Sequence, residues 1–513
     1  MAFISNLGIA FEEIVNQYPD RAALIYPATE ECFSYSELNR LVDRIGSVLW
    51  GMGLRPGQVA VLFHDKSPNA FAAMLACLRL GIIYSNLDPD CPWERLYKIL
   101  GTCRPHLVIN AFDRLPFSDK FSASGFHNIL HLRKMPEYTP INALPDLCAI
   151  SGGAPAYIMF TSGSTGVPKG AVMSHANLLW FILWAQDRFI ITPDDVLTNV
   201  NPMYFDNSVF DFYSTFFSGA ALVPINSEQV RDTRLLVRMV NDAGCSIWFS
   251  VPSLLVYLLT TRALAVSDFP KIRKIIFGGE GFPKTKLSQL FNLFGSRADL
   301  ENVYGPTECT CICSAYTICE DDFQDMQSLA PLGLSAQNFD IEILPLDYAI
   351  RDFGELFLRG PQVGLGYYND PERTANAFCQ NPLHSNYVDF GYRTGDLVRR
   401  DARGYLHFKG RVDFQIKHMG YRIELEEVEA ALNSLSDVTE SAVIYHKLGD
   451  GLGQILAFVA ADTPVSSQKL KGQVSGLLPS YMVPRRITLL GKLPKNANGK
   501  IDRIALQAYA ESA

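Results

Sequence analysis

A loop rich in glycine and hydroxyl side chains, at residues 161–170, is the segment of this sequence best suited to hold phosphate groups. It follows the apolar stretch 157–160, which predicts a buried strand. Successive backbone N–H groups in such a loop can surround an anion, and Lys169 adds a positive charge. The loop is not a Walker A motif, because Pro168 precedes the lysine and Gly170 follows it. We interpret it as a phosphate-binding loop rather than a flexible linker, because a linker needs neither a buried strand before it nor a lysine that closes it.

Four later segments carry polar residues that are ambiguous when each segment is taken alone. Residues 302–308 end in Thr307, which could meet a phosphate, and Glu308, which could ligate Mg²⁺, although Gly-Pro turns are common in loops. In residues 392–397, Asp396 could accept hydrogen bonds from a ribose diol or could simply stabilise its own turn. The other two segments are residues 410–413 and residues 494–502, the latter with a lysine on a glycine turn that is usually a solvated charge.

Cysteines alternate with other residues between positions 309 and 313. This period-two spacing predicts that Cys309, Cys311 and Cys313 lie on one side of a strand, with Cys319 shortly after it. A zinc site is the alternative, but zinc sites favour paired C-x₂-C segments, and no histidine lies nearby. We therefore expect buried thiols packed along a strand.

The composition is that of a well-packed globular protein with more than one domain. The chain has 513 residues, too many for a single core, and 48% of them are hydrophobic while 19% are charged. A net charge of −8 without any dense basic run indicates no nucleic-acid partner. The apolar stretch 70–83 is cut by Arg79 and is too short to span a membrane, so no membrane partner is expected. The N-terminus lacks the basic segment of a secretory signal, which predicts cytoplasmic residence.

Alternating helical and strand-like patterns predict an α/β fold with mostly parallel sheets covered by helices on both faces. Between residues 340 and 368, short alternating segments with turn glycines predict a β-barrel-like piece. The predicted helices cover residues 35–52, 69–81, 234–243 and 253–264, and the predicted strands cover residues 58–64, 246–251 and 275–277.

The pattern changes near residue 410, where a small C-terminal domain is predicted to begin. A helix at 424–435 and strands at 441–445 and 454–459 indicate α+β structure. We therefore expect a large N-terminal core, residues 1–411, and a small C-terminal lid, residues 412–513.

The five motifs occur in an order that is far more specific than any one of them. In that order the sequence resembles the adenylate-forming enzymes, the superfamily of acyl-CoA synthetases, luciferases and adenylation domains. Within it, the sequence is most similar to a stand-alone, amino-acid-activating adenylation domain of nonribosomal peptide synthesis. The resemblance runs from Phe33 to Lys500. It implies an AMP-forming amino acid–carrier protein ligase that uses ATP and Mg²⁺.

The resemblance assigns roles to individual residues around the nucleotide. Tyr304 would stack on adenine, Asp396 would bind the ribose and Glu308 would ligate Mg²⁺, while the loop at 161–170 would hold the β- and γ-phosphates. The implied catalytic residues are Lys500, Lys169, Thr307 and Glu308, and the implied ATP-binding residues are Thr161, Ser162, Gly163, Ser164, Thr165, Gly166, Lys169, Gly279, Asn302, Tyr304, Gly305, Thr307, Asp396, Phe408, Arg411 and Lys500.

The resemblance also implies two successive reactions and a mobile lid. An amino-acid carboxylate attacks the α-phosphorus of ATP, pyrophosphate leaves, and the phosphopantetheine thiol of a separate carrier protein then attacks the adenylate. Asp413 would be the hinge, and Lys417 with Gly420 would line the approach of the thiol. Met419 stands where the family usually has a basic residue. A small activator protein is a further candidate partner.

A Phe-Asp-x-Ser motif at residues 205–208 resembles the family's amino-acid-binding motif. It implies that Asp206 pairs with the α-ammonium group, which distinguishes amino acids from fatty or aryl acids. The rest of the implied lining is largely apolar, so we expect an aliphatic substrate similar to isoleucine or valine. The implied substrate-binding residues are Asp206, Asn207, Phe210, Phe249, Ile276, Gly278, Val303, Cys311 and Ile312.

Three alternatives stay open. An acyl-CoA synthetase would share the ATP-binding residues but would not need Asp206. A D-alanine–carrier protein ligase would share the same machinery. A non-catalytic nucleotide-binding or scaffold protein is disfavoured, because Glu308, Asp396 and Lys500 are all present.

Overall fold

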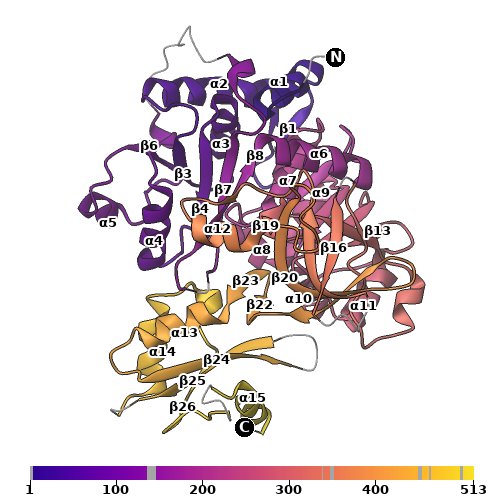
Figure 1. The fold of residues 1–513 in the computed structure, drawn as a ribbon. Coiled ribbons are helices and arrows are strands. Elements are labelled where there is room, and N and C mark those ends of the chain that lie inside the picture. Colours follow the sequence, from indigo (N-terminus) through magenta and orange to yellow (C-terminus); the bar gives the residue numbers. More distant parts are fainter. Residues whose placement is uncertain are drawn as a thin grey trace.

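A computed structural model of the chain describes residues 4–135, 146–163, 165–337, 339–346, 352–448, 453–461, 464–496 and 501–512. Figure 1 shows a large N-terminal part that carries a smaller C-terminal part, with β22 (Gln415–His418) and β23 (Tyr421–Glu424) at the junction. In the described ranges, no helix is both long enough and apolar enough to cross a membrane.

One mixed sheet is built from the N-terminal third of the chain, with one short edge strand added from Gly366–Tyr367. Its central strands are wholly buried, and the one predicted at 58–64 is an unbroken apolar run. Adjacent strands of this sheet pair in parallel, except that β7 pairs with β8, and β8 with β18, in antiparallel. In spatial order, the described residues give β18 (Gly366–Tyr367), β8 (Lys169–Ser174), β7 (Pro155–Thr161), β4 (Ile83–Leu87), β3 (Val59–Phe63), β5 (Leu107–Asn110) and β6 (Ile129–His131).

Helix ends in this part follow from local capping residues. Ser34 and Glu37 form a reciprocal capping box at the start of α2 (Tyr35–Gly51). Ser67 caps α3 (Pro68–Leu80), which ends where Gly81 adopts a left-handed conformation. Both helices match the predicted ones to within one residue at each end. The other helices here are α1 (Leu7–Gln17), α4 (Trp93–Cys103), α5 (Ser118–Ala123) and α6 (His175–Phe189).

A second mixed sheet is built mainly from residues 196–335, with two edge strands from the start of the chain. Its middle strands are parallel, and antiparallel strands complete both edges. In spatial order, its described strands are β15 (Leu334–Ser335), β14 (Ser314–Thr317), β13 (Asp299–Tyr304), β12 (Lys274–Gly278), β11 (Ile247–Ser250), β9 (Val196–Asn199), β10 (Ala221–Pro224), β1 (Ala22–Tyr26) and β2 (Glu31–Ser34). Its helices are α7 (Asn207–Phe216), α8 (Ser227–Arg231), α9 (Thr233–Ala243), α10 (Pro252–Thr260) and α11 (Lys284–Phe294).

An antiparallel sheet forms the predicted β-barrel-like piece, and its curvature makes it a half-barrel. Adjacent strands pair in antiparallel register, and the register shifts where β20 meets β17 and where β20 meets β21, as β-bulges do in curved sheets. Its described strands are β16 (Asp340–Pro345), β17 (Phe353–Arg359), β20 (Phe390–Arg400), β19 (Phe378–Gln380) and β21 (Leu406–Arg411), and α12 (Pro371–Ala377) lies beside it.

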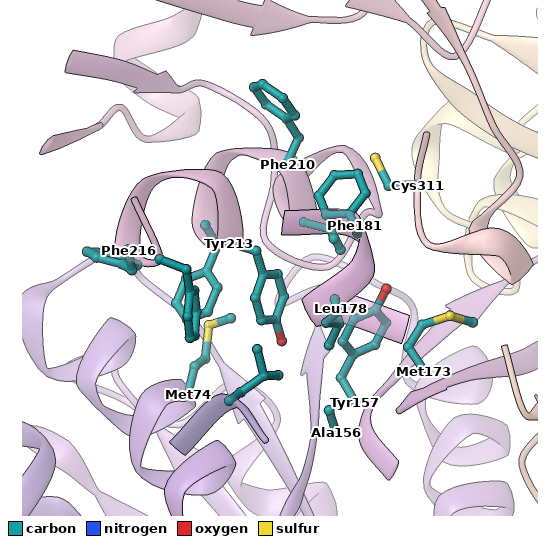
Figure 2. Close-up of a cluster of buried hydrophobic side chains, with 14 of the residues drawn as sticks. Met74, Ala156, Tyr157, Met173, Leu178, Phe181, Phe210, Tyr213, Phe216 and Cys311 are labelled. Atoms are coloured by element: carbon teal, nitrogen blue, oxygen red, sulfur yellow. The ribbon is translucent and has the colours of Figure 1, made fainter. Parts of the chain in front are cut away.

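The largest hydrophobic cluster joins the two mixed sheets. Figure 2 shows Met74 of α3, Tyr157 of β7, Phe181 of α6 and Tyr213 of α7 converging in it. The hydroxyl groups of Tyr84 and Tyr213 meet at 2.8 Å across this core. Helix α7 is therefore anchored in the core on the side away from the cleft described below. Its first turn faces that cleft.

The C-terminal part has hydrophobic clusters of its own. They contain residues from Ile416 onward, whereas the clusters of the sheets end at Phe408. This division supports the predicted boundary between residues 411 and 412, which remains a prediction. The described elements are β22, β23, β24 (Glu440–Lys447), β25 (Gly453–Ala460), β26 (Arg486–Leu489), α13 (Leu425–Asn433), α14 (Ser467–Ser475) and α15 (Arg503–Ser512).

Two predicted elements differ from the structure. Helix α10 ends at Thr260 rather than at residue 264, because Arg262 adopts a left-handed backbone with φ of 54°. The predicted strand through residues 309–313 is wrong. Thr307–Cys309 form a short 3₁₀ turn, and Thr310 and Cys311 both have positive φ, so strand β14 begins only at Ser314.

Candidate active site

A cleft lies where the loops that follow β7, β12 and β13 meet the β22–β23 hairpin. Loops at the carboxyl ends of parallel strands are the usual place for ligands in open α/β sheets. The empty space in and around the cleft, open solvent included, is about 920 Å³, and the lining includes Thr161, Ser162, Asp206, Thr307, Asp396, Lys417 and Arg422. The structure therefore brings together residues from four of the five sequence motifs.

Asp396 is the buried acid at one end of the cleft. Its carboxylate accepts a hydrogen bond from the Tyr304 hydroxyl at 2.5 Å and pairs with Arg411 at 2.5 Å. Arg411 also holds Asp413, the predicted hinge residue, at 2.6 Å. This chain of contacts fixes a carboxylate beside an aromatic ring, an arrangement that suits a ribose and a flat base.

Of the other residues predicted to bind ATP, two are packed away from the cleft and two line it. Asn302 is buried and donates to the carbonyl of Pro331, and Phe408 packs against the main core from β21. Gly279 and Gly305 line the cleft, and Gly279 has a φ of 91° that only glycine adopts readily.

The phosphate loop begins at the end of β7, as predicted. Ser162 is almost fully buried, and its hydroxyl donates to the carbonyl of Arg422 at 2.8 Å. Lys169 begins β8, and its ammonium group lies 3.8 Å from Glu308. Gly166 turns the loop with φ of 74°. Ser164 and Lys500, both predicted to contact ATP, lie outside the described residues.

Three cations beside this loop had no signal in the sequence. Lys98 donates to the carbonyl of Gly166 at 2.8 Å, and Arg373 donates to the hydroxyl of Thr165. Arg95 lies in the lining of the cleft. They come from α4 and α12, far from the loop in sequence, so a search for local motifs could not have found them.

Glu308, the predicted metal ligand, is wholly buried and surrounded by polar groups. Arg422 pairs with it at 2.6 Å, and the hydroxyl of Tyr367 donates to it at 2.7 Å. Burial by itself would raise the pKa of Glu308, but Arg422 and Lys169 outweigh that effect and lower the pKa to about 2. The carboxylate is therefore ionised while these cations lie beside it.

Asp206 lies at the N-terminus of α7, where an aspartate usually caps the helix. Its side chain caps nothing here and instead accepts a hydrogen bond from the Thr307 hydroxyl at 2.5 Å. Burial raises the pKa of Asp206, while the bond from Thr307 and the charges of Arg422 and Lys417 oppose that rise. A half-buried carboxylate that is left free of helix capping is suited to pair with a ligand cation.

The rest of the pocket wall beside Asp206 is largely apolar. Phe210 and Ile276, also predicted to line it, stand behind this wall. Phe210 packs edge-on against Phe249 with ring centroids 5.0 Å apart, and Ile276 pairs in register with Phe249 across the sheet. The lining residues among those predicted are Asn207, Phe249, Gly278, Val303, Cys311 and Ile312.

The loop between Tyr304 and Cys313 folds back on itself. The amide of Cys313 donates to the carbonyl of Tyr304 at 2.8 Å, and a Cβ placed on Gly305 would lie 2.3 Å from the carbonyl oxygen of Cys311. The left-handed backbone at Thr310 and Cys311 makes this reversal. One tight loop thus carries residues of the phosphate end and of the apolar wall.

The hairpin of β22 and β23 places Lys417 and Gly420 in the cleft. The ammonium group of Lys417 lies 5.1 Å from the centre of the Tyr304 ring. Met419 is exposed at the hairpin turn with φ of 50°. The amide of Gly420 donates to Glu280 at 3.0 Å, a contact that the sequence did not predict.

The segment that bears Lys500 is flanked by residues that lie away from the cleft. Lys495 pairs with Glu440 of β24, and Ile501 packs with the second C-terminal cluster. Neither residue lines the cleft. The structure therefore presents the hairpin, rather than these flanking residues, to the cleft.

Comparison with known proteins identifies the same family over most of the chain. A family model described as AMP-binding enzyme matches residues 11–368, and one described as AMP-binding enzyme C-terminal domain matches residues 427–500.

Two characterised proteins of similar length match from end to end. An L-proline–[L-prolyl-carrier protein] ligase from Pseudomonas fluorescens is 34% identical over 96% of this chain and 97% of its own. A D-alanine–D-alanyl carrier protein ligase from Lacticaseibacillus rhamnosus is 30% identical over 98% of this chain and 99% of its own.

Among solved structures, an NRPS protein containing adenylation and PCP domains, bound to a vinylsulfonamide inhibitor, superimposes with a TM-score of 0.85 at 23% identity. That superposition covers 98% of this chain and 84% of the other, and at this identity it shows the fold alone.

Proposed function

The chain belongs to the AMP-binding enzymes, and from that premise we propose that it activates an amino acid with ATP and transfers it to a carrier protein. It is then an AMP-forming amino acid–carrier protein ligase, like the proline and D-alanine ligases to which it is similar. The finer proposal is that the amino acid is aliphatic, similar to isoleucine or valine, and that the carrier is a separate protein with a phosphopantetheine thiol.

The observation that carries the proposal is the position of Asp206. Its carboxylate faces the cleft, makes no helix cap and lies beside an apolar wall. A substrate ammonium group would give this acid a charge-assisted hydrogen bond, which is worth about 1.5–3 kcal/mol. A fatty or aryl acid would leave the carboxylate without a cationic ligand.

The first reaction needs positioning and charge neutralisation rather than a protein nucleophile. The substrate carboxylate attacks the α-phosphorus, the bond to the bridging oxygen breaks, and pyrophosphate leaves with that electron pair. Thr307 would contact the α-phosphate, and Lys169 with the loop amides would hold the leaving group. Asp396 would orient the ribose through its hydroxyl groups. Lys500 would bind the reactants after the C-terminal domain has rotated about Asp413.

Glu308 fits a bound magnesium ion. Its carboxylate is ionised and fully buried, and Arg422 now supplies the opposite charge. When Arg422 moves away with its domain, the acid needs another cation, and a hard oxygen ligand suits Mg²⁺. The ion would supply positive charge to the phosphate oxygens.

The arrangement of the hairpin suits the second reaction. Lys417 and Gly420 stand at the cleft, while the described neighbours of Lys500 do not. A thiol that arrives beside the hairpin would attack the carbonyl carbon of the adenylate, and AMP would leave. Closing the cleft with this hairpin would also keep water from the reactive anhydride.

Phe249, Val303 and Ile312 support an aliphatic substrate. They give the pocket an apolar wall, and the absence of a side chain at Gly278 lets Val303 pack directly against it. The described lining offers no second acid beside this wall to receive a basic side chain. Pockets of this kind separate substrates that differ by one methylene by only about 1–3 kcal/mol, so several aliphatic amino acids should be accepted.

ATP–pyrophosphate exchange across a panel of acids tests the proposal. The panel contains L-isoleucine, L-valine, L-proline, D-alanine and 3-methylpentanoic acid, which is isoleucine without its amine. We expect the fastest exchange with the branched amino acids and none with 3-methylpentanoic acid. Exchange with that acid at a rate similar to isoleucine would contradict the role of Asp206, and thioester formation on coenzyme A rather than on a carrier protein would favour an acyl-CoA synthetase.

A further inference from the structure

The C-terminal domain places two carboxylates on the phosphate loop. Glu427, in the first turn of α13, accepts a hydrogen bond from the amide of Gly163 at 3.1 Å and pairs with the guanidinium of Arg95. Glu424, at the end of β23, lies 3.5 Å from the ammonium group of Lys169. Glu427 and Glu424 are 3% and 5% exposed, so both carboxylates are almost dry in this arrangement.

Backbone contacts fix these carboxylates in place. The hydroxyl of Ser162 donates to the carbonyl of Arg422 and accepts from the amide of Glu424 at 3.2 Å. The hydroxyl of Ser162 and the amide of Gly163, which would suit a phosphate anion, are thus already hydrogen-bonded to the C-terminal domain. The first turn of α13 contacts the loop through Glu427, and Figure 1 shows α13 in the C-terminal part, on the side that faces the N-terminal part.

A cation from the same domain occupies the metal-ligand position. Arg422 lies 2.6 Å from Glu308, whose carboxylate is wholly buried. Arg422 and Glu424 are two residues apart on β23, so they arrive and leave together. One strand therefore delivers a positive charge to Glu308 and a negative charge to Lys169.

The charges at this junction balance only while the domains are docked. Among the described residues that pair here, the cations are Arg95, Lys169 and Arg422, and the carboxylates are Glu308, Glu424 and Glu427. If the C-terminal domain leaves, Arg95 and Lys169 lose an anion, and Glu308 loses a cation. Leaving buried charges unpaired is costly. Arg95 and Lys169 then require another anion, and Glu308 requires another cation.

We propose that Glu424 and Glu427 are positioning residues that take the place of pyrophosphate in the phosphate loop, while Arg422 takes the place of the metal ion at Glu308. The inference rests on the proposed function, because it takes the loop to be the pyrophosphate site. Its consequence is that the docked hairpin and magnesium pyrophosphate exclude one another. The domain then reaches the docked arrangement only after pyrophosphate has left, and the chain's own charges hold it there for the thiol.

Binding of magnesium pyrophosphate to the full chain, measured by calorimetry without ATP or amino acid, tests this exclusion. Glu427→Gln and Glu424→Gln each remove one competing charge, so each variant should bind pyrophosphate more tightly, by about 5-fold or more. Glu511→Gln is the matched control, because Glu511 is exposed on α15 of the same domain. It should bind as the unmodified chain does.

Hydrogen exchange gives a second measurement that does not depend on catalysis. In the unmodified chain, magnesium pyrophosphate should speed exchange in the peptide covering residues 415–427, because the hairpin undocks. In Glu427→Gln the same peptide should exchange faster before any pyrophosphate is added.

The outcomes separate this inference from the proposed function. Equal pyrophosphate affinity in both glutamine variants and the control, or unchanged exchange in residues 415–427, would overturn the inference. Lys169→Ala tests the site itself, and it should weaken binding in every background. If that variant left pyrophosphate affinity unchanged, the loop would not be the pyrophosphate site, and the proposed function would fail with the inference.

Discussion

Replacing Asp206 by asparagine removes one negative charge from the cleft while keeping the size of the side chain. The asparagine can still accept the hydrogen bond that Thr307 donates to Asp206 at 2.5 Å, so the fold and the nucleotide end of the cleft should be preserved. What is lost is the charge-assisted bond to the substrate ammonium group. That bond is worth about 1.5–3 kcal/mol, which corresponds to a fall of about 10- to 150-fold in kcat/KM.

The assay is ATP–pyrophosphate exchange with L-isoleucine and L-valine, for the unmodified chain and for Asp206→Asn. The KM for the amino acid should rise, while the KM for ATP should stay within about twofold of its original value. Asn207→Asp, which moves a carboxylate by one position, is a useful comparison because Asn207 also lines the pocket. When Asn207→Asp is combined with Asp206→Asn, the double variant should not regain the lost activity.

The pH dependence gives a further test of the same residue. Burial raises the pKa of Asp206, so its carboxylate takes up a proton at a higher pH than an exposed aspartate does. As the pH falls toward that raised value, the KM for the amino acid should therefore increase. Asp206→Asn should lack this increase. Exchange with isoleucine that is unaffected by the substitution at any pH would refute the reasoning.

Three further predictions concern other parts of the molecule. In Gly278→Ala, the added Cβ would lie 2.4 Å from the carbonyl oxygen of Val303, so a melting experiment should show a loss of about 1–3 kcal/mol, whereas Gly472→Ala, inside helix α14 with no neighbour within 4 Å, should show no loss and a gain of about 0.5–1 kcal/mol. Burial lowers the pKa of His175 to about 4, so the unfolded chain takes up the proton first and stability should fall as the pH drops from 6.5 toward 4; a His175→Asn variant whose melting temperature kept the same pH slope would contradict this. Lys417→Ala should slow loading of the carrier by about tenfold or more while leaving pyrophosphate exchange nearly unchanged, as measured by the two partial reactions, and an equal loss in both would argue against a role in the second step.

Much of the fold could be predicted because its elements carry strong local signals. Helix α2 has a capping box at Ser34 and Glu37, and α3 ends at a glycine with φ of 65°. The strand at 59–63 is an unbroken apolar run, as a strand buried on both faces should be. The order of the motifs predicted which segments would meet in the cleft, and the structure brings most of them there.

The features that the sequence failed to predict all depend on tertiary contacts between residues far apart or on opposite sides of a tight loop. Period-two spacing of the cysteines predicted a strand, but the backbone is left-handed at Thr310 and Cys311, and the chain folds back so that the carbonyl of Cys311 lies against Gly305. Arg373 reaches Thr165 of the phosphate loop from a distant helix, Arg95 reaches Glu427 beside it, and no local pattern marks either residue. Glu427 looks like an ordinary first-turn acid of a helix, and only the docked arrangement shows that it contacts Gly163.

The folded-back loop between Tyr304 and Cys313 bears on any attempt to redesign substrate preference. Cys311 and Ile312 contribute side chains to the specificity wall, yet their backbone closes against the turn that presents Thr307 and Glu308. Mutating these two positions will shift turnover together with selectivity. Phe249, by contrast, projects from a regular strand with parallel neighbours on both sides. Directed evolution of this enzyme should therefore begin at position 249, where a new side chain can reshape the pocket without disturbing the residues that meet the nucleotide.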